Sequence, residues 1–84
     1  MKKVLLLDET AIFRDYLHLY LSVYFPNVIV VSSPEEAQFK LDEEEFDLFL
    51  SNSRRLVSYK TSARIVTFLS LEEFFEYIQK IQSD

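Results

Sequence analysis

The chain has 84 residues and a formal net charge of −5, from 9 Lys and Arg against 14 Asp and Glu. It contains no Cys and a single His, which excludes disulfide frameworks, Cys-based zinc sites and histidine-rich metal sites. The acidic balance argues against a nucleic-acid partner bound through its phosphates. With 49% hydrophobic and 27% charged residues, the composition predicts one globular domain, residues 1–84.

The first apolar stretch, residues 4–7, is followed by the acidic pair Asp8 and Glu9. It is too short for a signal peptide or a membrane span, so we expect a cytoplasmic protein with no membrane partner. A short continuous apolar run is typical of a strand that is covered on both faces, as in a parallel sheet. Residues 4–7 are therefore the first predicted strand.

The first helix is predicted over residues 11 to about 24, with Thr10 as its N-cap and Pro26 beyond its end. Its polar side chains form a narrow stripe, and nine large apolar side chains and Ala11 occupy the rest of its surface. A helix that covers one face of a small sheet needs an apolar arc of only about 100°. The apolar surface is therefore larger than the sheet requires, and the surplus includes Tyr16, Tyr20 and Tyr24.

Residues 27–32 are rich in β-branched side chains and predict a second strand, again buried on both faces. Ser33, Pro34 and Glu36 form a capping box that predicts a second helix running to about Glu45. A third strand is predicted over residues 48–50 and ends at Ser51, Asn52 and Ser53.

For residues 53–63 the sequence pattern does not distinguish between a helical turn, a short strand and an ordered loop. Residues 64–69, which include Phe68, predict a fourth strand with apolar groups on both faces. Ser70 and Glu73 form a second capping box, and the residues that follow have the apolar spacing of a helix. This order of elements predicts a layered α/β domain with a parallel sheet and helices on both faces.

Several segments resemble CheY-like two-component receiver domains: the acidic pair after the first strand, and residues 33–37, 46–50 and 70–75. The resemblance implies a flavodoxin-like layered fold with a mainly parallel four-stranded sheet and about three helices. Only 11 residues separate Asn52 from Arg64, where the family has two helices and a strand. The chain is therefore expected to be a shortened receiver.

In receivers, the acidic pair holds Mg²⁺, and an Asp at the end of the third strand accepts phosphate. Asn52 stands at the position of that Asp, and a carboxamide does not form an acyl phosphate. The Lys that the family carries after its last strand is also missing. The resemblance thus implies a degenerate pseudo-receiver with no catalytic residues and no cofactor, in which Asp8 and Glu9 are a residual acidic pocket.

We therefore expect a phosphorylation-independent protein–protein interaction module in signal transduction, not an enzyme, with a homodimer as the simplest assembly. Its candidate interface comprises Tyr16, Tyr20, Tyr24 and Phe68. One alternative is a sensor of a small ligand, Mg²⁺ or an anion that uses Asp8, Glu9, Asn52, Arg54 and Arg55, the first three as metal ligands. Another is a receiver that is phosphorylated at a different residue.

Overall fold

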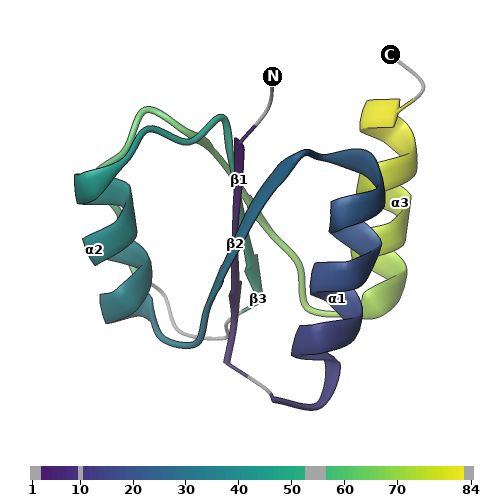
Figure 1. Cartoon of the computed structure of the whole chain (residues 1–84). Coiled ribbons are helices and arrows are strands. Elements are labelled where there is room, and N and C mark those ends of the chain that lie inside the picture. Colours follow the sequence, from purple (N-terminus) through teal and green to yellow (C-terminus); the bar gives the residue numbers. More distant parts are fainter. Residues whose placement is uncertain (1–2, 10, 53–56, 83–84) are drawn as a thin grey trace.

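The computed structural model describes residues 3–9, 11–52 and 57–82. The chain folds into a four-stranded sheet with helices on both faces (Figure 1). The predicted order of strands and helices is confirmed. The elements are β1 (Lys3–Asp8), α1 (Ala11–Tyr24), β2 (Asn27–Val31), α2 (Pro34–Glu43), β3 (Leu48–Asn52), β4 (Arg64–Thr67) and α3 (Leu71–Gln82).

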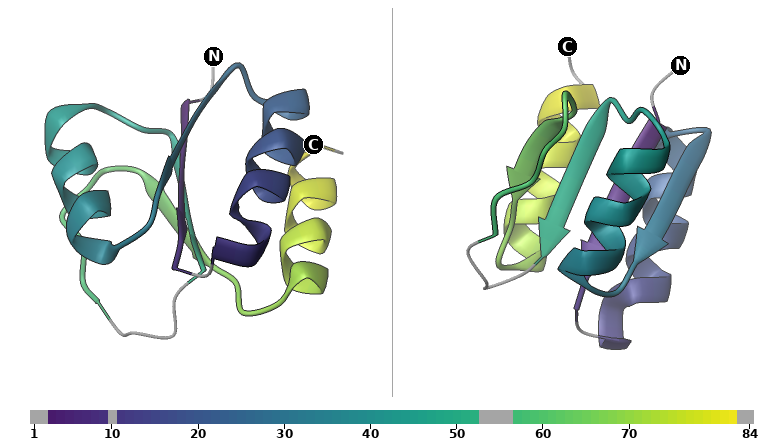
Figure 2. Two further views of the ribbon diagram at one scale, coloured as in Figure 1. Left: turned by 60° about the horizontal axis from the view of Figure 1, so that its bottom comes forward. Right: turned by 90° about the vertical axis from the view of Figure 1, so that its left-hand side faces the viewer.

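The strands are all parallel and lie in the order β2-β1-β3-β4. Helices α1 and α3 lie side by side on one face of the sheet, and α2 lies on the other (Figure 2). Parallel neighbours need long crossover connections, and α1 and α2 supply the first two. The third, from β3 to β4, contains no helix in its described residues, 57–63. The layered α/β architecture is thus as predicted.

The central strand β1 explains why the sheet has a core on each side. Successive side chains of a strand point to opposite faces. Val4 and Leu6 pack in the cluster beneath α1 and α3, Leu5 and Leu7 pack in the cluster beneath α2, and all four are fully buried. The predicted burial of this strand on both faces is therefore confirmed. The α1 and α3 side chains fully or almost fully buried in the first cluster are Leu17, Leu21, Phe74 and Ile78.

The two edge strands are less covered than predicted. In β2, Asn27 is exposed and the next three residues are only half-buried. The fourth strand ends at Thr67 instead of Leu69, and Ile65 is 43% exposed. Both strands have a neighbour on one side only, so their side chains are shielded from one side and open to water on the other.

Helix α2 begins as predicted and ends slightly earlier. The side-chain oxygen of Ser33 accepts a hydrogen bond from the backbone N–H of Glu36 at 3.1 Å. The helix ends at Glu43, because Glu44 is extended (φ −138°, ψ 156°) while its N–H donates to the carbonyl of Lys40. No residue in the described part of the chain has a positive φ, so this helix ends without the left-handed residue that many helices use.

The second capping box starts α3. The Ser70 hydroxyl oxygen accepts a hydrogen bond from the N–H of Glu73 at 3.2 Å. The Glu73 carboxylate in turn accepts one from the N–H of Leu69 at 3.0 Å. The Ser70 bond satisfies one of the backbone donors that a helix N-terminus leaves unpaired, and the Glu73 bond satisfies the N–H of the residue before the cap. The predicted start of the last helix is thus confirmed.

The segment before β4 is an ordered loop over the same face as α2. The side chain of Gln38 accepts a hydrogen bond from the N–H of Lys60 at 3.0 Å and donates one to its carbonyl at 3.2 Å. The Tyr59 ring packs on Phe49, and Ala63 is buried. Of the open interpretations of residues 53–63, the loop is therefore correct for residues 57–63, whereas residues 53–56 lie outside the described part.

Candidate functional site

The carboxyl ends of β1 and β3 are where the topology favours a ligand site. The chain leaves β1 for β2 over one face of the sheet, and it leaves β3 for β4 over the other face, where residues 57–63 lie. Ligands of open α/β sheets bind where two such crossovers diverge, beyond the carboxyl ends of the strands. Asp8 ends β1, Asn52 ends β3, and the two are direct partners in the register. The structure thus brings together two of the predicted site residues.

The contacts at this strand end are made by an amide and a guanidinium. The Asn52 Nδ2 donates a hydrogen bond to Asp8 Oδ1 at 3.2 Å, and the Asp8 side chain is fully buried. From the first turn of α1, Arg14 Nη2 donates to the backbone carbonyl of Asp8 at 3.2 Å. A buried carboxylate needs a donor such as the Asn52 amide, because burial removes it from water. Arg14 was not predicted as a site residue, although its place one turn into the helix after the acidic pair was the available signal.

This donor set does not fit Mg²⁺. Magnesium takes oxygen ligands in near-octahedral geometry. Asn52 instead turns its N–H toward Asp8, on the carboxylate that a metal would need. Within residues 3–9, 11–52 and 57–82, no three Asp, Glu or His side chains are grouped to hold a metal ion. Glu9 is half-buried beside this strand end, and Arg54 and Arg55, predicted for an anion, lie outside the described residues.

The four predicted interface aromatics differ in exposure. Tyr16 is 54% exposed and Tyr24 is also exposed. Tyr20 is half-buried, because its ring packs against Phe74 and Phe75 of α3 at centroid distances of 5.8 and 5.0 Å. Tyr20 therefore joins two helices in addition to bordering the surface.

The prediction of a surface position for Phe68 is wrong. Phe68 is 3% exposed and belongs to the core beneath α1 and α3, where its ring lies 5.0 Å from that of Phe74. The strand ends at Thr67, and the N–H of Phe68 still donates to the carbonyl of Ser51 at 2.9 Å. This bond holds Phe68 against β3, and its ring fills the space beneath α3.

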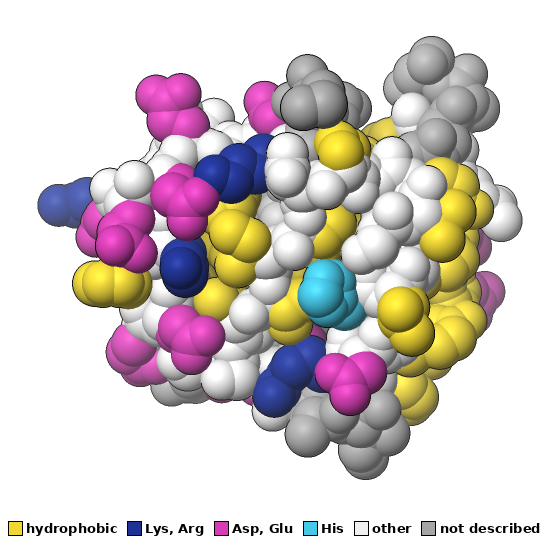
Figure 3. All heavy atoms as spheres, in the orientation of Figure 1, with side chains coloured by type: hydrophobic (Ala, Val, Ile, Leu, Met, Phe, Trp, Pro, Cys, Tyr) yellow, Lys and Arg dark blue, Asp and Glu magenta, His cyan; other side chains and the backbone are white. Residues whose placement is uncertain are grey.

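The most exposed large apolar side chains of α1 were not predicted as site residues. Leu19 is 71% exposed and Val23 is 77% exposed. Together with Tyr16 they form what we call the outer face of α1. Figure 3 shows hydrophobic side chains gathered over α1 and α3, whereas charged side chains dominate over α2. The signal was in the sequence, since an apolar arc this wide cannot all face the sheet.

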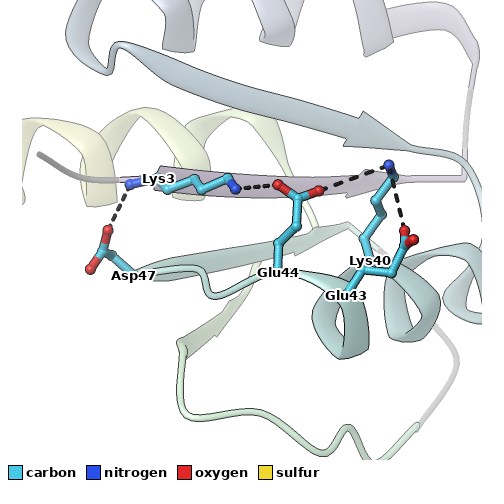
Figure 4. A network of polar contacts seen from close by, with 5 residues as sticks. All are labelled: Lys3, Lys40, Glu43, Glu44 and Asp47. Carbon is cyan, nitrogen blue, oxygen red and sulfur yellow. Dashed lines mark hydrogen bonds and ion pairs between the residues drawn. The ribbon is translucent and has the colours of Figure 1, made fainter.

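A polar network closes the opposite end of the sheet (Figure 4). The Lys3 backbone N–H donates to Asp47 Oδ2 at 2.7 Å, and the side-chain ammonium group of Lys3 pairs with Glu44. The Glu44 carboxylate also lies 4.0 Å from Lys40 Nζ. The hydrogen bond from Lys3 lowers the pKa of Glu44 below its ordinary value. The strand register explains the contact between Lys3 and Asp47, because the residues that follow them, Val4 and Leu48, are partners in the sheet.

A cavity of about 470 Å³ adjoins this network. Its lining is mainly polar and comes from the amino ends of the strands and the loop after α2: Lys3, Asn27, Glu45, Phe46, Asp47 and Ser62. The Lys3 ammonium lies 5.0 Å from the centre of the Phe46 ring. These residues tie β1 to the start of β3 and to the end of α2, so we assign the network a structural role.

Comparisons of the chain with protein-family models, with curated proteins and with solved structures find no match. None of the helices in the described part is long and apolar enough to cross a bilayer.

Proposed function

We propose that the chain is a phosphorylation-independent pseudo-receiver that acts as a protein–protein interaction module and catalyses no reaction. The observation that carries this proposal is the outer face of α1, where Tyr16, Leu19 and Val23 are each more than half exposed. Exposed apolar groups that lie next to one another mark interaction surfaces in soluble proteins. The inner side of the same helix already serves the fold through Leu17 and Leu21.

The assignment to a shortened receiver of the flavodoxin-like class is supported by two features of the topology. The strand order β2-β1-β3-β4 follows the first four positions of the flavodoxin-like order. The first and last helices share one face of the sheet, and α2 lies on the other (Figure 2). Receivers place their first and last helices in the same way, according to the resemblance described above.

The proposal that no phosphate is transferred is supported by the contact between Asn52 and Asp8. By the receiver resemblance, Asn52 stands at the position of the phosphoacceptor, and its side chain offers Asp8 an amide N–H. Because no acyl phosphate forms, the protein would act only through association of its exposed α1 surface with a partner.

The phosphorylation arm of this proposal is tested by intact mass and amide NMR spectra. Incubation with Mg²⁺ and acetyl phosphate should leave the mass unchanged, and Mg²⁺ with beryllofluoride should leave the amides of β1 and β3 unshifted. A phosphate adduct on any residue would contradict the proposal. Shifts produced by Mg²⁺ alone at Asp8 and Asn52 would favour the sensor alternative instead.

The interaction arm is tested by photo-crosslinking in the cells that produce the protein. A benzophenone side chain at position 19 should yield a discrete covalent adduct. The same side chain at Phe39, which is 60% exposed on α2, is the matched control and should yield none. Equal adducts at both positions, or none at position 19, would contradict the assignment of the interaction surface to α1.

A further inference from the structure

We propose that the outer face of α1 binds α1 of a second copy of this chain, with the two helices antiparallel across a two-fold axis. This inference rests on the proposed function and names the partner of the same surface. Three observations support it: the spacing of the exposed residues, the position of the charges, and the ends of the helix.

The exposed apolar residues have the spacing of a helix–helix seam. Tyr16 and Leu19 are three residues apart, and Leu19 and Val23 are four apart. This alternation keeps side chains on one line along a helix and is the spacing that packs one helix against another. The seam extends about 10 Å, seven residues at 1.5 Å each. The side of α1 that the sheet uses is separate from it, since Leu17 and Leu21 are fully buried.

The distribution of charge selects a surface through which two copies can meet. The chain carries a net charge of −5, so two copies repel each other over most of their surface. The three side chains of the outer face of α1 are uncharged, although Asp15 borders them and the acids of α3 lie on the same side of the sheet, whereas α2, with its cluster of acids, lies across the sheet (Figure 1). Contact through α1 keeps the two α2 helices apart. In a two-fold pair the same uncharged seam serves both sides.

The ends of α1 favour an antiparallel neighbour. Helices α2 and α3 both have acidic residues in the first turn and a Lys in the last turn, which offset the partial charges of a helix dipole. Helix α1 has neither an acid in its first turn nor a base in its last. An antiparallel copy places ends of opposite partial charge side by side. The ends of α1 therefore favour the antiparallel arrangement over the parallel one.

The single acid of α1 also favours this orientation. Asp15 lies four residues from Leu19, so an antiparallel pair centred on Leu19 separates the two Asp15 residues by about 12 Å along the axis. This distance exceeds the screening length of about 8 Å at physiological salt. A parallel pair would set the two carboxylates next to each other. A helix pair of this length makes a small interface, so we expect a dissociation constant in the micromolar range.

The test is the solution mass of the whole chain, measured by sedimentation equilibrium over micromolar to millimolar concentrations. The wild type should pass from monomer to dimer in this range. Leu19→Glu should raise the dissociation constant at least about thirtyfold, as expected for a residue at the centre of an interface. Phe39→Glu, the same substitution at a similarly exposed apolar residue of α2, should leave it unchanged. A wild type that stays monomeric, or equal effects of both substitutions, would overturn the proposal.

Mixing two charge variants tests the two-fold geometry directly. Leu19→Glu and Leu19→Lys should each be monomeric alone, because like charges meet at the axis. An equimolar mixture should restore a dimer that contains one chain of each kind. If the mixture stays monomeric, the two copies of Leu19 are not neighbours and the antiparallel pair is wrong. Val23→Glu is the second variant should Leu19→Glu melt at a lower temperature than the wild type.

The outcomes separate this inference from the proposed function. A wild type that stays monomeric, together with a crosslinked product at position 19 that contains another protein, overturns the dimer and keeps the interaction module. A monomer with no crosslink at position 19 overturns both. A crosslinked product with twice the mass of the chain, together with restored dimerisation in the mixture, supports both.

Discussion

The ring of Tyr59 meets the ring of Phe49 edge-on, with the two centroids 4.8 Å apart and the ring planes at 88°. This contact fixes the loop of residues 57–63 over the face of the sheet that α2 alone would leave partly open. Aromatic pairs in this geometry contribute about 0.5–1.5 kcal/mol beyond the area that they bury. The loop therefore takes the place of a helix in covering the sheet.

Removing the Tyr59 ring should destabilise the fold. We expect Tyr59→Ala to lower the free energy of unfolding by about 2 kcal/mol, since it removes both the ring contact and apolar burial. Tyr59→Phe keeps the ring and should cost clearly less. Urea denaturation followed by circular dichroism measures both values. Equal losses in the two variants would show that the ring contact does not stabilise the loop.

Replacing the amide at the strand end by a carboxylate should also destabilise the protein. Asn52→Asp exchanges a donor to Asp8 for a like charge, and we expect a loss of about 2 kcal/mol near neutral pH. Asn52→Ala, which loses the hydrogen bond without adding charge, is the control. The excess loss of Asn52→Asp should shrink on addition of Mg²⁺. A variant as stable as the wild type without Mg²⁺ would contradict the role of this contact.

The ion pair between Lys3 and Glu44 predicts that the free energy of unfolding decreases at low pH. The hydrogen bond from Lys3 lowers the pKa of Glu44 in the folded protein below 4.5. The folded state then binds this proton less readily than the unfolded state, so the contribution is complete above about pH 4.5 and is lost as the pH falls through the folded pKa. Glu44→Gln should flatten the decline of stability with acid. Urea denaturation at several pH values measures it, and an unchanged slope would refute the prediction.

The raised pKa of Tyr20 predicts that the protein loses stability at high pH. Burial, and then the hydrogen bond with Tyr24, raises the pKa of Tyr20 above 10.0. The unfolded chain therefore loses this proton first as the pH rises, so the contribution is present below about pH 10 and is lost as the pH rises through the folded pKa. Titration of the tyrosinate absorbance should show one delayed group that is absent in Tyr20→Phe. The prediction fails if the two titration curves coincide after scaling for tyrosine content.

The sequence was most informative where local rules decide the structure. The capping boxes at Ser33 and Ser70 marked helix starts to the residue, because the cap is a contact between near neighbours in the chain. The continuous apolar run of residues 4–7 indicated a strand buried on both faces, because such a strand carries apolar side chains at every position. The order of elements then predicted the layers without any long-range information.

Features that depend on distant neighbours could not be read in this way. The half-exposed β2 and the burial of Phe68 follow from which strands lie at the edge and where α3 packs, which no local pattern specifies. In α1 the width of the apolar arc showed that some residues are exposed but not which ones. The structure selected Leu19 and Val23, because Leu17 and Leu21 face the sheet. The contact between Lys3 and Glu44 joins residues 41 positions apart.

The sequence has no Gly, and this absence affects the unfolded chain as well as the end of α2, where the extended Glu44 follows the helix. Every residue carries a Cβ atom, so the denatured ensemble has fewer backbone conformations than that of a chain with ordinary turns. Replacing a Gly by Ala at a compatible position typically stabilises a protein by about 0.4–1 kcal/mol through this effect alone. Part of the stability of this small domain therefore comes from the lower conformational entropy of its unfolded chain.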